Sequence, residues 1–144
     1  EVEVEVEAKL KIPVVALSAR VEAEVAELGR EEARLYLAEL GVSQSGLDRL
    51  VSLAYGKLNL ISFLTAGEKE VRAWTIERGS KAPEAAGVIH SDFEKKFIKA
   101  KVCSYDDFIE YQGWKGVAEE GKMRMEGREY EMKEGDVVEF MIGQ

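Results

Sequence analysis

The sequence contains very little of the chemistry that most catalytic sites use. It has one cysteine, Cys103, and one histidine, His90, in 144 residues. A single cysteine excludes an intrachain disulfide. Cys103 follows an alternating segment, IKAKVCSY, that is typical of a strand end, so we interpret it as a small buried hydrophobe rather than a nucleophile. Nothing in the sequence indicates that Cys103 and His90 form a catalytic pair.

Long apolar runs are also absent from the sequence. No segment approaches the roughly 20 consecutive apolar residues that a membrane helix needs. The first residues lack the basic and then apolar pattern of a secretory signal. We therefore expect a cytoplasmic protein with no membrane partner, and its 46% hydrophobic and 33% charged residues are usual for a folded domain.

Positive charge is in the minority. The chain has 20 Lys+Arg against 28 Asp+Glu, a formal net charge of -8. Such a chain repels phosphates on average, so bulk attraction to nucleic acid is excluded and no DNA partner is expected. Any contact with RNA would need a local basic patch.

The first 57 residues predict strands followed by helices. EVEVEVE (1–7) alternates with the period of a half-buried strand, and IPVVALSA (12–19) contains the short apolar run of a strand buried on both faces. Spacings of three and four residues between apolar positions then predict three helices, over 21–28, 31–40 and 46–55. Ser45 is the expected cap of the third helix.

From residue 58 the pattern changes to short strands. LNLISFLTAG (58–67) and EVRAWTIERG (70–79) predict a hairpin. The elements expected after it are a helix from Ser80 through Ile89, a strand over 97–102, a short helix over 106–111, a glycine-rich surface segment over 113–121, two short strands within 122–132 and a last strand over 135–142. One helix crossing a mixed sheet of four or five strands is an α+β fold of the β-grasp (ubiquitin-like) kind.

Four blocks of sequence carry a family resemblance. They are QSGLDRLV at 44–51, FLTAGEKEVRAWT at 63–75, KAPEAAGVIHSDFEKKFIKAKV at 81–102 and EGDVVEFMI at 134–142. In order and spacing they resemble the C-terminal region of the YchF (Obg-like) family of P-loop ATPases/GTPases. The resemblance implies that residues 58–144 are a TGS domain, a β-grasp module generally regarded as facing RNA or the ribosome. Residues 1–57 would be the end of the P-loop α/β domain.

The resemblance extends to a nucleotide-contacting loop. ALSAR at 16–20 is similar to the fifth nucleotide motif of P-loop GTPases, which implies that Leu17, Ser18 and Ala19 contact the base in the intact parent. The alternative is a strand-to-helix turn capped by Ser18. GxxxxGK[ST] does not occur in the 144 residues, so the chain has no phosphate cradle. ATP or GTP with magnesium is implied for the parent only, and we expect no cofactor, metal or catalytic residue in this chain.

The candidate RNA contacts are basic residues of the second half. They are Arg72, Arg78, Lys95, Lys96, Lys99 and Lys101, with Trp74 or Phe97 as stacking partners. Lys99 and Lys101 alternate on one face of the expected strand. The alternative is a solvated sheet face balanced by glutamates.

Two further candidates have an ordinary structural alternative. His90, beside Asp92, could act as an acid–base group or sense RNA phosphate, or it could simply end a helix. Tyr111 and Trp114 could anchor a partner or cover the edge of the core.

Two functions remain open at this point. The first is an RNA- or ribosome-binding module. The second is an interaction domain that packs against the parent's own nucleotide-binding and helical domains without touching RNA. An autonomous enzyme has no support in the sequence.

Overall fold

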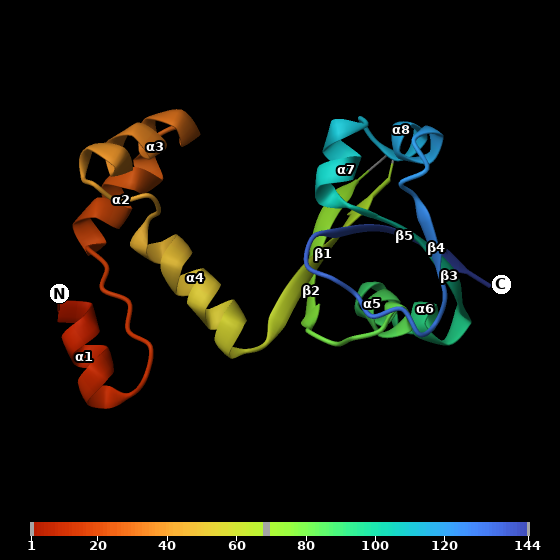
Figure 1. Ribbon diagram of the computed structural model, residues 1–144, viewed down its shortest axis with the longest axis horizontal. Helices are drawn as coiled ribbons and strands as arrows, with labels where there is room; N and C mark the ends of the chain where they lie inside the picture. Colours follow the sequence, from red (N-terminus) through yellow and green to blue (C-terminus); the bar gives the residue numbers. More distant parts are fainter. Residues whose placement is uncertain (1, 68–69, 144) are drawn as a thin grey trace. The chain divides into compact units, whose positions relative to one another are not determined.

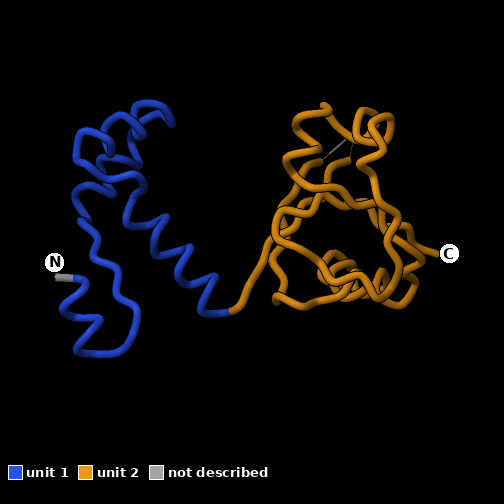
Figure 2. The backbone as a smooth tube through the Cα atoms, in the orientation of Figure 1, with its two compact units in different colours: residues 1–58 blue, residues 59–144 orange. Residues whose placement is uncertain are grey.

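The computed structural model describes residues 2–67 and 70–143. The chain divides into two compact units, Glu1–Leu58 and Asn59–Gln144, called unit 1 and unit 2 below (Figure 2). No helix in the described ranges is long and apolar enough to cross a membrane.

The described residues of unit 1 form four helices. They are α1 (Val2–Leu10), α2 (Ala19–Glu27), α3 (Arg30–Glu39) and α4 (Gly46–Lys57) (Figure 1). Serine caps begin two of them, because Ser18 Oγ accepts the Val21 N–H at 3.4 Å and Ser45 Oγ accepts the Asp48 N–H at 3.0 Å. The three helices predicted over 21–55 and the Ser45 cap are thereby confirmed.

The strand predicted over residues 1–7 is wrong, because residues 2–10 form helix α1; Glu1 lies outside the described residues. A strand needs a neighbour to satisfy its backbone, whereas a helix satisfies its own. Two glutamates on this helix, Glu3 and Glu7, accept the backbone N–H groups of Ala16 and Val14 at 2.6 and 2.8 Å. Glu3 also pairs with Arg49 at 2.7 Å. These contacts favour the helix over the strand that alternation predicts.

The strand predicted within residues 12–19 is wrong as well. Residues 13–18 have no regular secondary structure until α2 begins. Their backbone donors at Val14 and Ala16 bond to the glutamates of α1 rather than to another strand. The described part of unit 1 contains no strand with which this segment could pair.

Unit 2 contains the sheet and four short helices among its described residues. Its elements are β1 (Leu60–Ala66), β2 (Val71–Glu77), α5 (Ala82–Ile89), α6 (Ser91–Lys96), β3 (Phe97–Ser104), α7 (Tyr105–Glu110), α8 (Trp114–Glu119), β4 (Arg124–Glu126) and β5 (Asp136–Ile142) (Figure 1). The predicted hairpin is confirmed by the antiparallel pairing of β1 with β2. Its turn residues 68 and 69 lie outside the described residues.

The five strands form one mixed sheet in the order β2-β1-β5-β3-β4. β1 runs parallel to β5 and antiparallel to β2, while β3 is antiparallel to both β5 and β4. The α+β class is thereby confirmed. β2 and β4 are the two edges of the sheet.

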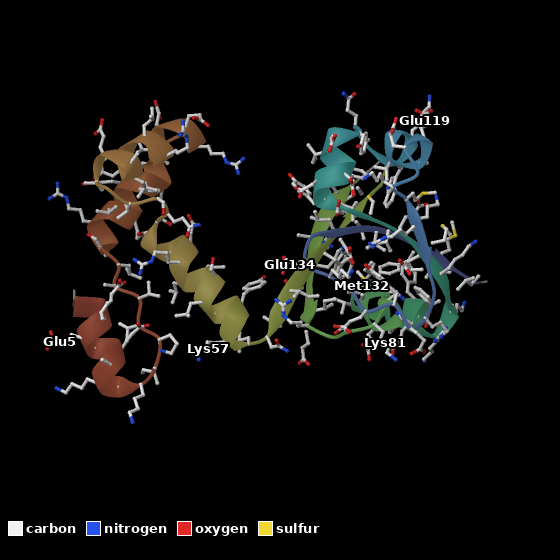
Figure 3. All side chains as sticks on the ribbon, in the orientation of Figure 1. Glu5, Lys57, Lys81, Glu119, Met132 and Glu134 are labelled. Atoms are coloured by element: carbon white, nitrogen blue, oxygen red, sulfur yellow. The ribbon has the colours of Figure 1, made fainter. Side chains whose placement is uncertain are left out.

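The two faces of the sheet carry separate cores. On the face that we call the α5 face, Phe63 and Val102 are fully buried beneath α5 and α6, and the Phe63 ring meets the Phe140 ring edge-on at 5.9 Å. Met132, labelled in Figure 3, completes this core at 2% exposure. On the opposite face, the α7 face, Val137 packs with residues of α7 and α8.

Three expectations for unit 2 need correction. Residues 113–121 were expected as a surface segment but form α8, whose Val117 is fully buried. Gly116 of α8 lets the helix backbone lie close to the Tyr111 carbonyl oxygen, since a Cβ on this residue would lie 1.9 Å from that oxygen. Within 122–132 only β4 is a strand, and Glu131 makes a single bridge to Lys81. The short helix α6 was not predicted.

Candidate nucleic-acid interface

The predicted basic residues of unit 2 lie on both faces of the sheet. Residues directly opposite each other on adjacent strands share a face. The register therefore places Arg72 with Trp74 on the α5 face and Lys99 with Lys101 on the α7 face. β1 and β5 also separate β2 from β3, about 14 Å at the usual strand spacing. Arg72 and Lys99 therefore do not belong to one compact patch.

Three lysines flank the junction of α6 and β3. Lys95 and Lys96 occupy the last turn of α6, Lys99 lies near the start of β3, and all three are exposed. None of them forms an ion pair with any residue in the described ranges. Lysines without a carboxylate partner keep their full charge for a phosphate. These three residues are called the lysine cluster.

Lys101 differs from its neighbour on the same face. Its ammonium group pairs with the Glu139 carboxylate at 2.8 Å, and its side chain is only 27% exposed. Glu139 lies directly across the β3–β5 ladder, where opposite charges stabilise each other. The charge of Lys101 is therefore largely balanced within unit 2.

A further cation that the sequence did not single out is Arg128. Its Nη1 donates to the Phe97 carbonyl oxygen at 2.8 Å, and its guanidinium lies 5.8 Å from the Phe97 ring. It forms no ion pair among the described residues. It therefore adds positive charge next to the lysine cluster. Its position depends on tertiary packing, so no sequence motif marks it.

The two predicted arginines of β2 have different surroundings. Arg72 lies 4.2 Å from the centre of the Trp74 ring, and Trp74 Nε1 donates to Thr65 Oγ1 at 2.9 Å. The Trp74 side chain is half-buried, and the Arg72 guanidinium covers its ring. A nucleobase could stack on this ring only if Arg72 moved. Arg78 is exposed just beyond the end of β2. The other stacking candidate, Phe97, is 4% exposed and belongs to the core.

His90 stands between α5 and α6. It ends the first helix and caps the second, with its Nδ1 accepting the Asp92 N–H at 3.2 Å. Its ring packs against Phe93 at 5.6 Å. The helix-end interpretation accounts for these contacts. The side chain remains exposed, one short helix away from the lysine cluster.

The predicted base-contact loop lies in unit 1. Ser18 caps α2, and Leu17 is 48% exposed. Leu17 also packs closely on the start of α4, since a Cβ on Gly46 would lie 2.5 Å from the Leu17 Cβ. The N–H groups of Gly46 and Leu47 donate to the Glu22 carboxylate at 2.7 and 3.3 Å. The Glu22 carboxylate therefore occupies the position at the start of α4 where a bound anion would accept these hydrogen bonds.

Residues 2–67 and 70–143 contain no cluster of three or more His, Cys, Asp or Glu that could hold a metal ion. Burial raises the pKa of the Cys103 thiol to about 11, so it stays protonated near neutrality. Burial and its hydrogen bond to Asp136 also raise the pKa of Tyr130 well above its usual range.

Tyr111 and Trp114, the two aromatic candidates of the sequence, belong to the α7-face core. Trp114 Nε1 donates to the Ala66 carbonyl oxygen at 2.9 Å, and its ring meets Phe108 edge-on at 5.3 Å. Tyr111 packs against the same cluster. Both residues therefore cover the edge of the core, the second of the two predicted roles.

Comparison with known families then identifies the chain. Residues 60–143 match the family described as YchF-GTPase_C, "Protein of unknown function (DUF933)". This chain belongs to the YchF family. It is 51% identical over 138 residues to the "Ribosome-binding ATPase YchF" of Escherichia coli O157:H7, and 50% identical over 127 residues to that of Bacillus subtilis (strain 168). These matches cover 96% and 88% of the chain.

Solved structures agree with this assignment. The YchF GTPase of Schizosaccharomyces pombe superposes with a TM-score of 0.77 and 37% identity over 90% of the chain, which is 34% of its own length. A GTP binding protein from Pyrococcus horikoshii OT3 has the same fold, with a TM-score of 0.64 at 17% identity over 97% of the chain and 40% of its own. The chain spans 38% and 35% of the length of the two curated YchF relatives.

Proposed function

We propose that this YchF-family chain docks on the ribosome or on RNA through unit 2, and that unit 2 is a TGS domain. The observation that carries the proposal is the lysine cluster. A chain of net charge -8 presents three exposed lysines with no carboxylate partner among the described residues. The names of its relatives, ribosome-binding ATPases, support the same partner. Such a partner would place the protein in the cytoplasm.

The topology of unit 2 supports the TGS assignment. A mixed five-stranded sheet with a central parallel pair, β1 beside β5, and a helix packed across one face is the arrangement of a β-grasp domain. Because α7 and α8 cover only part of the opposite face, Lys99 and Met125 remain exposed there. An open sheet face beside basic residues is suited to RNA.

Nucleotide binding and hydrolysis belong, in this proposal, to other parts of a YchF-type protein. ATP or GTP with magnesium would be held there, and unit 1 would add the loop from Leu17 to Ala19 at the base. The residues of this chain do not fit the phosphates, because Glu22 fills the start of α4 and the sequence has no GxxxxGK[ST]. The isolated chain is expected neither to bind nor to hydrolyse nucleotide.

Exposed apolar residues support a second role, as an interaction domain for the parent's nucleotide-binding and helical domains. Unit 1 leaves many large apolar side chains open, including Leu35 at 57% and Leu47 at 55% exposure. A patch of this kind usually marks a surface that another protein surface covers. This role concerns unit 1 and is compatible with RNA docking by unit 2.

The decisive experiment is co-sedimentation of the chain with ribosomes, and with mixed RNA, at increasing salt. Each phosphate neutralised adds about 0.7–0.9 to the slope of log affinity against log salt. A variant with Lys95→Glu, Lys96→Glu and Lys99→Glu is therefore expected to reduce the slope by about 2–3 and to bind weakly even at low salt.

The matched control reverses three lysines elsewhere, with Lys9→Glu, Lys57→Glu and Lys115→Glu. It has the same net charge as the first variant, so a comparable loss in both would mean that bulk charge, not the lysine cluster, determines binding. Lys101→Glu should have a smaller effect than Lys99→Glu, because Lys101 is already paired. If the native chain does not sediment with ribosomes or RNA at low salt, the docking proposal is wrong.

A further inference from the structure

Strands β1 and β5 separate before β5 ends. Among the described residues their last parallel pair is Thr65 with Val138, although β5 continues along β3 as far as Ile142. The Ala66 carbonyl oxygen, which comes next on β1, accepts the Trp114 indole N–H at 2.9 Å. No described strand fills the space beside the second half of β5, so the sheet is open there.

The backbone of Phe140 faces this opening. At the two ends of β5, Gly135 and Gly143 form hydrogen bonds with the residues that flank β3. Because backbone direction alternates along a strand, the even-numbered residues of β5 direct their N–H and C=O groups away from β3, toward the β1 side. Val138 is paired with β1. Phe140 is the next such residue, and its N–H and C=O groups have no partner in the described ranges.

The opening lies within a groove of about 1060 Å³, whose lining includes the end of β1 and the middle of β5. Side chains from both faces of the sheet line it. Ile89 and Phe93 belong to the α5 face, whereas Phe108 and Trp114 belong to the α7 face. One groove reaches both faces because the sheet is open between them. An aromatic-lined concavity of this size, with a free backbone donor and acceptor, is typical of a binding site.

The described lining of the groove has little unbalanced charge. Its charged residues are Glu70 and Glu139. Glu139 pairs with Lys101 at 2.8 Å. Glu70 lies two residues before Arg72, so the two side chains share a face of the sheet. An uncharged ligand therefore fits this groove better than a phosphate or a basic segment does.

The shape of the site favours an extended segment. A strand placed in line with β1 would lie about 4.8 Å from β5, where it can bond with the N–H and C=O groups of Phe140. Its side chains would alternate between the side of Phe93 and the side of Phe108. Because both sides are apolar, consecutive side chains of the segment must be apolar, as they are in strands that are buried on both faces.

We propose that this groove binds an uncharged, extended segment of a partner protein that contains a run of consecutive apolar residues. The segment continues the sheet along β5 beyond the end of β1. It pairs with the backbone of Phe140 and packs against aromatic side chains on both faces. None of the lysines of the lysine cluster is in the described lining. The chain then has one surface for RNA and another for an apolar segment of a protein.

The test is an NMR titration of the isotopically labelled 144-residue chain with a blocked peptide, in which two valines alternate with two isoleucines between flanking serine and glycine residues. We expect saturable shifts at the Phe140 amide and at the Trp74 and Trp114 indoles. N-methylation of the four apolar residues keeps their side chains but removes their N–H donors, so it should weaken binding about fivefold or more. Serine in place of both isoleucines leaves one face of the peptide polar and should weaken binding about tenfold or more.

A matched pair of variants locates the site. Ile109 lines the groove and Ile98 does not, yet their side chains are 57% and 56% exposed. Ile109→Glu places a carboxylate beside the bound apolar segment and should weaken peptide binding about fivefold or more, whereas Ile98→Glu should change it less than about twofold. Because both positions are exposed, unit 2 should remain folded in both variants, and the dispersion of their spectra checks this.

Four results would overturn the proposal. The first is the absence of saturable shifts at Phe140. The second is equal binding of either altered peptide, which would exclude a strand buried on both faces. The third is a stronger response of the same resonances to oligouridylate, which would make the groove an RNA site. The fourth is a shift of the Phe140 amide that grows with protein concentration without peptide, which would make the occupant a second copy of the chain.

The outcome is separable from that of the lysine-cluster proposal. Ile109→Glu should still sediment with ribosomes, because it leaves the three lysines unchanged. The variant with Lys95→Glu, Lys96→Glu and Lys99→Glu should still bind the apolar peptide, because those residues are not in the described lining of the groove. Failure of either proposal therefore leaves the other standing.

Discussion

The two units of this chain differ in how much of their apolar side chains they bury. Unit 2 buries Ile61 and Phe63 completely within the core of its α5 face, and a second core lies on its α7 face. Among the described residues of unit 1, Leu37 is the only buried hydrophobic side chain, at 8% exposure. Val4 and Leu35 are exposed to 69% and 57% in the same unit.

Unit 1 is instead held by carboxylates. Glu3 bonds the segment after α1 and Arg49, Glu22 caps α4, and Glu24 bonds the Tyr36 hydroxyl and Arg20. Hydrogen bonds that water can replace contribute about 0.5–1.5 kcal/mol each. Burying one large apolar side chain contributes about 1.5–3 kcal/mol. The contrast teaches that unit 2 can fold by its own core, whereas unit 1 needs a partner surface to become equally stable.

The largest expected effect comes from the core of unit 2. Phe63→Ala removes a fully buried ring that packs against Phe140, so the free energy of unfolding should fall by about 3–5 kcal/mol. Leu35→Ala in unit 1 should change it by about 0.5 kcal/mol or less, because that side chain is exposed. Urea unfolding followed by circular dichroism measures both. Equal losses would mean that the contrast between the units is wrong.

Glycine-to-alanine substitutions should have opposite signs in the two units. Gly116→Ala places a methyl group 1.9 Å from the Tyr111 carbonyl oxygen, so α8 must shift and stability should fall by about 1–3 kcal/mol. Gly56→Ala in α4 meets no atom within 4 Å and should raise helix stability by about 0.5–1 kcal/mol. Thermal unfolding of each variant checks the prediction, and a higher melting temperature for Gly116→Ala would contradict it.

Alkaline pH should weaken unit 2 through Cys103. Burial raises the pKa of this thiol to about 11 in the folded state, above the value of about 8.5 in an unfolded chain. The protonated Cys103 thiol therefore makes its full contribution to the free energy of unfolding below about pH 8.5. This contribution is lost as pH rises toward 11, by up to about 1.4 kcal/mol per pH unit. Urea midpoints at pH 7, 9 and 10 should decline less steeply in Cys103→Ala. An identical decline in both proteins would rule out this thiol as the cause.

The smallest expected effect is confined to unit 1. Glu22→Ala removes the carboxylate that accepts the Gly46 and Leu47 N–H groups, which should cost about 1 kcal/mol at the start of α4. Hydrogen exchange of these two amides should accelerate about fivefold. Glu27→Ala, at an exposed position in the same helix α2, is the control and should leave them unchanged. Faster exchange throughout unit 2 would show that the units are more tightly coupled than their cores suggest.

Local signals predicted much of the fold. The Ser45 cap and apolar spacing located α4, a β-rich composition located β1, and alternation located β2 and β3. Each of these signals acts within one element, so it survives in isolation. Alternation predicted a strand at 1–7 and a short apolar run predicted one at 12–19. Both predictions failed because a strand requires a neighbouring strand, and the carboxylates of α1 bond the second segment instead. α8 was missed because glycines that permit close approach look like loop residues in sequence.

In the candidate interface, too, residues that are neighbours in the chain could be predicted, whereas contacts that depend on tertiary structure could not. The lysines at the junction of α6 and β3 could be found from sequence, because they are neighbours in the chain. The neutralisation of Lys101 by Glu139 could not, since it requires the β3–β5 register. Arg128 was missed for a similar reason, because only packing brings it to Phe97. The site residues proposed for RNA and for the nucleotide base therefore remain predictions.

The parallel pairing of β1 with β5 has a consequence for how the protein is made. Leu64 pairs with Val137, about 70 residues further along the chain, and such distant pairings slow folding. During synthesis β1 and β2 emerge early as a hairpin, but a hairpin alone is marginally stable in water. Their sheet gains its central neighbour only after β5 has left the ribosome. Until then the nascent chain exposes Phe63 and the rest of its unfinished core, and it would be a substrate for chaperones.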